Sequence, residues 1–204
     1  MQNTARDMGE SSIEPIINMH HDVIAPHHKF GSVQYKGTPW DLSHLEAFAL
    51  RLDPDLGFKI DVIILFSCHC FSHSLDKDTR QNSTIPDDEI FENGRERRVL
   101  NEERYQLSRQ YLPKLIHELP QRKIQVASNA PNFMTFEFID SNQTEKLYAI
   151  FFEVEKDRTR KRRVLLRVQS AYILETLTHR KQKAGKVRFN VLLKATYEGR
   201  GIRG

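Results

Sequence analysis

The sequence predicts an α+β protein in which a curved antiparallel sheet of four or more strands carries a main helix on one face. Two observations predict this fold class. Residues 101–119 repeat apolar side chains with the period of a helix, and four later segments alternate apolar and polar residues with the period of a strand. The chain has 204 residues, which is enough for one ordinary domain with its own core.

Residues 1–30 contain Gly, Ser, Pro and four histidines but no apolar period. We expect them to form a flexible N-terminal arm, in which the histidines are either a solvated tail or metal ligands. Residues 31–204 are expected to form the single domain. Its first strand should lie near Val33 and Tyr35, and residues 58–66 are typical of a buried strand.

The next two segments are a loop and the helix. Residues 67–94 are polar and acidic, and we expect a long exposed loop there. In the helix of residues 101–119, apolar side chains recur at positions 107, 111, 115 and 119, and Asn101 is a suitable N-cap. Pro113 removes a backbone donor inside this helix, so we expect a kink or a break near Leu112.

The four strand candidates are rich in β-branched and aromatic residues and are separated by turn-forming or charged residues. They are residues 133–140, 146–155, 164–174 and 187–195. The connections between them are short, which favours an antiparallel meander.

Charge is distributed unevenly along the chain, although the formal net charge is only +4. Residues 1–155 hold 16 Lys or Arg against 24 Asp or Glu, while residues 156–204 hold 15 against 3. Such asymmetry indicates a nucleic acid or another acidic partner, and RNA is the partner we expect. The alternative is that the basic segment docks on the acidic part of the same chain.

Composition also indicates where the protein acts. The longest apolar run, residues 62–66, is too short to span a membrane, and the N-terminus has no apolar signal-peptide core. The two cysteines, Cys68 and Cys70, enclose almost no loop, so no disulfide framework is expected. These features predict a cytoplasmic protein without membrane association.

Basic residues cluster in two places in the C-terminal part. A run that includes Arg162 and Arg163 falls between two predicted strands, where a hairpin tip can present cations to a phosphate backbone. On regular strands, one polar sheet face would display Arg167, Gln169, Arg188, Asn190 and Lys194. This face is either the floor of an RNA groove or the solvent side of a one-sided sheet.

The sequence Cys68-His69-Cys70, with His73 nearby, contains metal-ligating residue types, but the two thiols are closer in sequence than in structural zinc sites. Both cysteines are better explained as small core residues at a strand end, and we expect no metal and no cofactor. His69 remains a candidate general acid or base. The chain has no P-loop, nucleophile elbow, zincin or dinucleotide-binding motif, so the corresponding enzyme classes are not supported.

Several segments resemble a known bacterial family. They are TPWDLSHL at residues 38–45, FSCHCFS at 66–72, RRVLNEERYQLS at 97–108, and residues 148–154 and 167–172. The chain resembles proteins that travel with mobile elements and are sometimes labelled stationary-phase growth adaptation proteins. A helix followed by an antiparallel sheet, with Ser-Ala-Tyr on a late strand, is also similar in outline to the barnase, EndoU, colicin and RelE-like ribonucleases.

This second resemblance implies a toxin-like, metal-independent endoribonuclease, in which a ribose 2′-hydroxyl attacks the adjacent phosphate, and an antitoxin as a protein partner. By this analogy Arg167 and Arg188 would hold the phosphate and Ser170 and Tyr172 would supply hydroxyl groups. His69 or Arg104 would complete the catalytic set. On a regular strand Ser170 and Tyr172 lie opposite Arg167, so a bulge or barrel curvature is needed to bring them together. Without either, Ser170 and Tyr172 are core residues. The alternative function is a non-catalytic nucleic-acid or partner-binding module of a mobile element.

Overall fold

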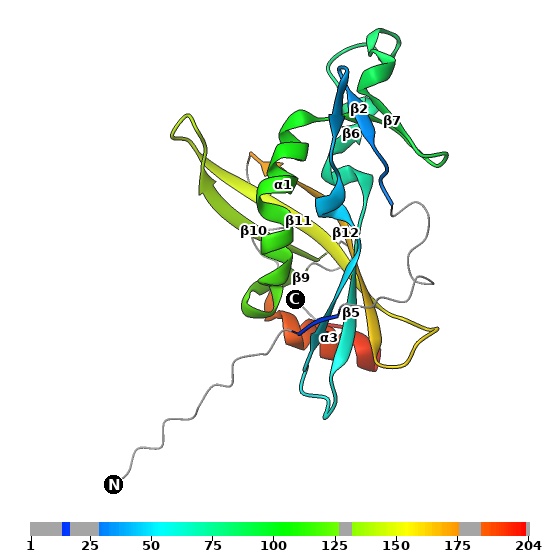
Figure 1. Ribbon diagram of the computed structural model, residues 1–204. Coiled ribbons are helices and arrows are strands. Elements are labelled where there is room, and N and C mark those ends of the chain that lie inside the picture. Colours follow the sequence, from blue (N-terminus) through cyan, green and yellow to red (C-terminus); the bar gives the residue numbers. More distant parts are fainter. Residues whose placement is uncertain (1–13, 17–28, 127–131, 176–184, 203–204) are drawn as a thin grey trace.

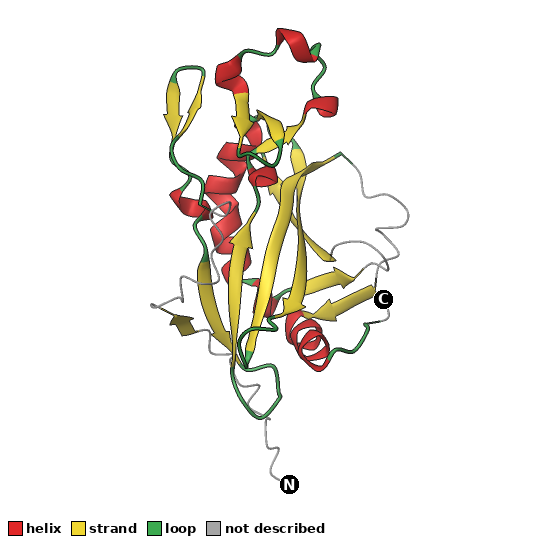
Figure 2. Cartoon of the chain, turned by 90° about the vertical axis from the view of Figure 1, so that its right-hand side faces the viewer, coloured by secondary structure: helices red, strands yellow, loops and turns green. Residues whose placement is uncertain are grey.

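The computed structural model describes residues 14–16, 29–126, 132–175 and 185–202 (Figure 1). It is an α+β fold, as the sequence predicts, and is built on one eight-stranded sheet with the strand order β1-β4-β5-β12-β11-β10-β9-β13. A two-stranded hairpin and a three-stranded sheet lie at one end of this large sheet, and helix α3 lies at the other end (Figures 1 and 2).

The centre of the large sheet contains three of the four predicted strands. They are β10 (Asn132–Ile139), β11 (Glu145–Lys156) and β12 (Arg163–Leu174), which form the expected antiparallel meander. The predicted buried strand is β5 (Ile60–Phe66), which pairs with β12 in parallel. The sheet is therefore mixed. The remaining strands are β1 (Glu14–Ile16), β4 (Phe48–Leu52), β9 (Lys123–Val126) and β13 (Gly185–Arg188).

Helix α1 (Glu102–His117) begins where the sequence predicts, with the Asn101 side chain accepting a hydrogen bond from the backbone N–H of Arg104 at 2.9 Å. The helix continues through Pro113 as one element, so the break that we considered does not occur. Its apolar stripe packs on the sheet, because Leu107, Leu112 and Ile116 belong to the same buried cluster as the side chains of β5, β11 and β12.

The prediction of a strand over residues 187–195 is wrong for most of its length. Strand β13 ends at Arg188, and α3 (Phe189–Glu198) follows directly. Phe189, Leu192, Leu193 and Tyr197 have helical spacing, and the first three are buried. Gly199 ends the helix in the left-handed conformation, with φ of 70°, that glycine adopts without steric cost.

The prediction of an exposed loop over residues 67–94 is also wrong. This segment contributes β6 (Ser72–Ser74) and β7 (Ile90–Glu92), which both pair with β8 (Arg97–Leu100) to form the three-stranded sheet. It also forms 3-10 turns at η4 (Cys68–Cys70), η5 (Leu75–Lys77), η6 (Asn82–Thr84) and η7 (Asp87–Glu89). Phe71 and Ile85 are buried, and these apolar anchors fix an otherwise polar segment.

The N-terminal region and the residues before β4 complete the described chain. We expected no regular element in residues 1–30, but Glu14–Ile16 pair with β4 as an edge strand; residues 1–13 and 17–28 lie outside the described residues. β2 (Val33–Tyr35) and β3 (Thr38–Trp40) form the two-stranded hairpin, and the turn η3 (Ser43–Leu45) follows. A further turn, η8 (Leu119–Gln121), joins α1 to β9.

A polar contact between η3 and α1 makes stability depend on pH. The Nε2 atom of His44 lies 2.8 Å from Ser108 Oγ, and Ser108 is fully buried. Burial, with a further contribution from the charge of Arg109, lowers the pKa of His44 to about 4 against the opposing effect of Asp41. The folded protein therefore keeps His44 neutral in a range where the unfolded chain binds a proton.

We predict that the free energy of unfolding falls as pH decreases from about 6.5 to about 4, because only the unfolded chain gains the His44 proton there. The ring is partly exposed, so we expect this residue to account for about 1–2 kcal/mol after solvent screening. Urea unfolding of the parent and His44→Gln across this pH range measures the difference. Equal pH dependence in the two proteins would contradict the prediction.

Candidate functional site

The candidate site lies where β5 ends beside β12. The parallel pairing stops at Phe66 and Val168, and the chain then turns into η4. The backbone N–H of Ser67 still donates to the Val168 carbonyl at 3.0 Å, and Ser67 Oγ donates to the Gln169 carbonyl at 2.5 Å. After Val168, β12 no longer pairs with β5, and η4 and α1 contact this part of the strand instead.

A bulge in β12 occurs at the same place. Phe152 pairs with Val168 and Phe151 with Ser170, so Gln169 is skipped in the register with β11. As a result Arg167, Ser170 and Tyr172 lie opposite Glu153, Phe151 and Ala149, which share one face of β11. The bulge therefore places these three predicted site residues on one face of the sheet.

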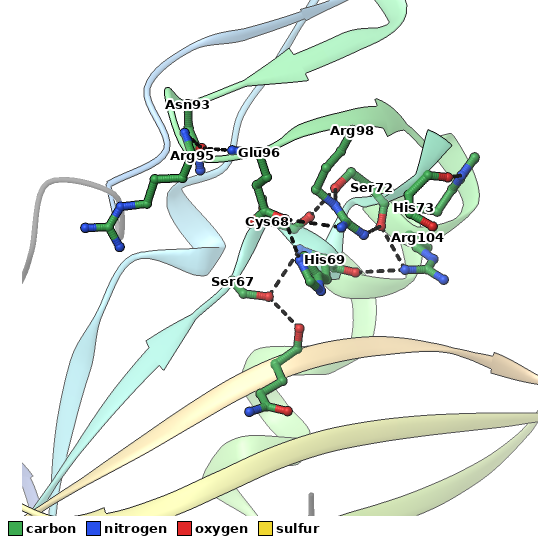
Figure 3. Close-up of polar contacts among 12 residues, drawn as sticks. Ser67, Cys68, His69, Ser72, His73, Asn93, Arg95, Glu96, Arg98 and Arg104 are labelled. Carbon is green, nitrogen blue, oxygen red and sulfur yellow. Dashed lines mark hydrogen bonds and ion pairs between the residues drawn. The ribbon is translucent and has the colours of Figure 1, made fainter. Parts of the chain in front are cut away.

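Turn η4 presents its side chains in a fixed way. Ser67 Oγ accepts a hydrogen bond from the backbone N–H of His69 at 3.2 Å, which caps the turn. Cys70 is fully buried, as expected for a core residue at a strand end, and burial raises the pKa of its thiol to about 12. Cys68 and His69 instead face the polar cluster drawn in Figure 3.

Glu96 is the centre of this cluster. Its carboxylate accepts hydrogen bonds from Cys68 Sγ at 3.1 Å and from Arg98 Nη1 at 3.2 Å, and it lies 2.9 Å from His69 Nε2 (Figure 3). The position of Glu96 is fixed by the preceding turn, where Asn93 Oδ1 accepts from the backbone N–H of Glu96 at 3.1 Å. His69 and Cys68, which precede Glu96 by 27 and 28 positions in sequence, thus both contact its carboxylate.

The electrostatics of the cluster keep Glu96 ionised. Burial alone would raise the pKa of its carboxyl group, but hydrogen bonds from Cys68 and His69, together with the charge of Arg98, hold the pKa below its ordinary value. For Cys68, burial and the hydrogen bond to Glu96 raise the pKa far above that of a free thiol. Cys68 is therefore a protonated donor to Glu96 at neutral pH and not a thiolate nucleophile.

Two arginines surround η4 and hold its backbone. Arg98 is buried and donates from Nε to Ser72 Oγ at 2.9 Å. Arg104, from the first turn of α1, donates from Nη1 to the carbonyls of His69 at 3.0 Å and Ser72 at 2.8 Å. Arg104 is therefore held by backbone carbonyls of η4 and β6.

Arg104 also connects η4 to the sheet. Its guanidinium carbon lies 4.7 Å from the centre of the Tyr172 ring, which is a cation–π contact. Arg104 therefore contacts both the backbone of His69 and the ring of Tyr172. Nearby in the core, the hydroxyl of Tyr148 is buried and has no hydrogen-bond partner among the described residues.

Arg167 and Ser170 share the face of Tyr172 but not this cluster. Arg167 pairs with Glu153 and Tyr172 with Ala149, and these two β11 residues are four positions apart, which corresponds to about 13 Å along the strand. Arg167 Nε donates to Glu155 at 2.9 Å. Ser170 is half-buried.

The residues predicted to bind nucleic acid do not form one surface. Arg163 is buried and its Nε donates to Asp157 at 2.6 Å, while Arg162 lies over the Phe58 ring at 4.8 Å. The prediction that Arg188, Asn190 and Lys194 share a sheet face with Arg167 and Gln169 is wrong, because Asn190 and Lys194 belong to α3.

Helical geometry explains where those two α3 side chains lie. Residues four apart on a helix share a face, and Asn190 and Lys194 both reach the β4–β5 connection. Asn190 Nδ2 lies 3.5 Å from the Asp53 carbonyl, and Lys194 Nζ donates to the Asp55 carbonyl at 2.8 Å. Arg188 precedes α3 and is exposed at the end of β13.

Glu96, Arg98 and Ser72 belong to the cluster but were not predicted as site residues from the sequence. Ser72 and Arg98 lie on the paired strands β6 and β8, at Ser72↔Leu100 and Ser74↔Arg98, in a region that we expected to be one loop and the approach to the helix. No period in the sequence joins these strands across the 22 residues that lie between them. The available signal was the cluster of charged residues at 95–98 directly before an apolar pair.

One set of three side chains among the described residues has the composition of a metal site: Cys68, His69 and Glu96, whose ligand atoms all lie within 4.8 Å of one another. Two features oppose a divalent cation there. Arg98 already contacts the carboxylate, and the Cys68 thiol donates a hydrogen bond to the same carboxylate. The donors present suit a hydrogen-bonded relay better than a metal.

Comparison with known proteins places the chain in a family. The YjaZ family matches residues 32–197, which include every described residue of the cluster. The chain belongs to the YjaZ family. No match was found among curated proteins or among solved structures. The YjaZ match starts at β2 and ends within α3, and no helix in the described part of this family member is long and apolar enough to cross a membrane.

The contacts of Arg104 predict a mainly structural effect of its removal. In Arg104→Ala the carbonyls of His69 and Ser72 lose a charged donor, and we expect a loss of about 2–4 kcal/mol in the free energy of unfolding. The matched control is Arg109→Ala on the exposed side of the same helix, which should cost less than about 1 kcal/mol. Equal urea midpoints for the two variants would show that Arg104 does not hold η4.

Proposed function

We propose that this YjaZ family member acts on RNA as a metal-independent endoribonuclease with His69 as its general base. One observation carries the proposal: a histidine and a carboxylate form a 2.9 Å pair at the protein surface, with side-chain exposures of 36% and 37%. Such a pair is accessible to a substrate and is oriented by its surroundings. Partial exposure distinguishes it from the buried Asp157 and Arg163 pair, which no substrate reaches.

The contact with Glu96 determines which His69 nitrogen can act. If Nε2 carries the proton and donates it to the ionised Glu96, Nδ1 is unprotonated and can accept a proton. Among the described residues, none forms a hydrogen bond with Nδ1 of His69. Glu96 would then orient the ring and stabilise the protonated imidazole, as the carboxylate of a catalytic triad does.

The proposed reaction needs only proton transfers. Nδ1 of His69 takes the proton of a ribose 2′-hydroxyl, and the oxygen attacks the adjacent phosphorus. The bond from phosphorus to the 5′-oxygen breaks, and a general acid protonates the leaving oxygen, which yields a 2′,3′-cyclic phosphate. We propose the Tyr172 hydroxyl as this acid because Arg104 holds its ring beside η4. The positive charges of Arg98 and Arg104 would favour the phosphate at this place.

The biological setting follows the resemblance seen in the sequence. We propose a cytoplasmic, toxin-like role for a protein of a mobile element, with an antitoxin as its protein partner. A second candidate function is a non-catalytic nucleic-acid or partner-binding module. The observation that favours it is that Arg98 and Arg104 already donate to Glu96, Ser72 and the η4 backbone.

Incubation of the purified protein with total RNA tests the proposal. We expect cleavage that persists in EDTA, falls at least about 100-fold in His69→Ala and falls less in Glu96→Gln, because a general base contributes about 10²–10⁴-fold. The control is His117→Ala, which removes an exposed histidine from the other end of α1.

Three outcomes would decide against the proposal. Cleavage that EDTA abolishes would favour a metal at Cys68, His69 and Glu96. Intact RNA together with a salt-sensitive gel shift would favour the binding module. Equal cleavage by His69→Ala and the parent would remove His69 from the mechanism.

A further inference from the structure

A second concave site lies beside the candidate cluster, between the β2–β3 hairpin and α1. It is a hollow of about 360 Å³, within the range of about 300–1,000 Å³ usual for small-ligand sites. The α1 wall consists of residues that share one helix face at spacings of three and four: Glu102, Tyr105, Gln106 and Arg109. The hairpin supplies the opposite wall.

Aromatic rings line this hollow in an ordered stack. Trp40 stacks on Tyr105 with ring centres 4.2 Å apart and planes 1° from parallel, and Tyr35 contacts Trp40 at 4.5 Å with its ring tilted by 36°. Trp40 and Tyr105 are buried, while Tyr35 is only half-buried. Tyr35 is therefore the ring of the stack that a ligand can meet, and the two rings behind it fix its position.

Two cations lie near the outer rings of this aromatic group. Lys36 Nζ lies 5.0 Å from the centre of the Tyr35 ring, and the Arg109 guanidinium carbon lies 5.7 Å from the centre of the Tyr105 ring. Lys36 is held in the hairpin turn by a left-handed backbone, with φ of 51°, and its side chain is 56% exposed. The nearest carboxylate to Lys36, that of Glu89, is 3.6 Å away and is also shared with Arg80.

These features together fit a ligand with a flat aromatic part and an anionic part. A half-exposed tyrosine offers a surface for a base, the two cations favour anionic groups, and Glu102 and Gln106 add hydrogen-bonding groups at the wall. Arg104 of the candidate cluster and Tyr105 of the hollow are consecutive residues, so their Cα atoms are about 3.8 Å apart. Residues of the same turn of α1 therefore contribute to both sites.

We infer that this hollow binds a ribonucleotide, with the base against the exposed part of Tyr35 and the anionic groups near the cations Lys36 and Arg109. The inference deepens the proposed function, on which it rests for the choice of ribonucleotide, by assigning a recognition site to the RNA strand. The same chemistry is present in a free nucleotide and in one unit of an RNA chain. The experiment separates these two sources.

Trp40 is the only tryptophan of the chain, so its fluorescence reports directly on the hollow. We expect the four nucleoside monophosphates, or some of them, to change Trp40 emission saturably. Lys36→Ala and Arg109→Ala should each weaken binding at least fivefold, whereas Lys114→Ala should bind as the parent does. Lys114 is a suitable control because it is an exposed cation on the same helix outside the hollow. Circular dichroism checks that each variant is folded.

A 2′-O-methyl RNA oligomer, which cannot form a cyclic phosphate, identifies the source of the ligand. Tighter binding of the oligomer than of the monophosphates indicates an RNA strand, and binding of monophosphates alone indicates a free nucleotide. Unchanged Trp40 emission with every probe would overturn the inference. Ribose 5-phosphate that binds as well as the nucleotides would also overturn it, because no base would then be recognised.

Failure of this inference can be told apart from failure of the proposed function. His69→Ala should keep the Trp40 response while losing cleavage. RNA cleavage that depends on His69 but is accompanied by no Trp40 response would reject the hollow alone. A Trp40 response in a protein that leaves RNA intact would reject the nuclease alone.

Discussion

The parallel pairing of β5 with β12 stops after six residue pairs, and the position of the candidate site depends on where it stops. Two hydrogen bonds from Ser67 satisfy carbonyls of β12 at this point, so the chain leaves the sheet without orphaned acceptors. Phe66 and Phe71 are both buried on either side of η4, which fixes the turn between two apolar anchors. The polar side chains of η4 are thereby held within reach of β8 and α1.

Glu96 connects three segments that are distant in sequence. A carboxylate that accepts from Cys68 and Arg98 and contacts His69 has little capacity left to act as a base itself. Its chemical effect is therefore exerted through His69, whose ring it orients. The same network explains why a thiol in this cluster differs from a reactive cysteine: its proton is held by a neighbouring anion, and no cation stabilises a thiolate strongly enough to release it.

Sequence periodicity predicted the parts of the fold whose partners are close in sequence. The α1 stripe, the Asn101 cap and the β10–β11–β12 meander are local patterns, and the structure contains all three. Residues 187–195 fit both periods, because Phe189, Leu193 and their neighbours can be read as alternating or as helical, and only packing on the sheet decides between the two. Glu96 could not be assigned to His69 from sequence, since their proximity depends on long-range pairing of β6 with β8. The need for a bulge near Ser170 could be stated from strand alternation, but its position at Gln169 depends on the register with β11.

The turn between β11 and β12 shows that cations in one run are not equivalent. Arg163 is neutralised inside the fold by Asp157, and Lys156 and Arg162 lie against Tyr197 and Phe58. Each cation that neutralises a phosphate releases counterions, at about 0.7 per contact for a single strand, and a buried ion pair releases none. The formal excess of positive charge in this part of the sequence therefore overstates the ionic-strength dependence that a polyanion would experience. The turn is short and is held by its own internal contacts, with a few charges at its tip. A polyanion would therefore interact with it through a few local contacts and not through a long-range field.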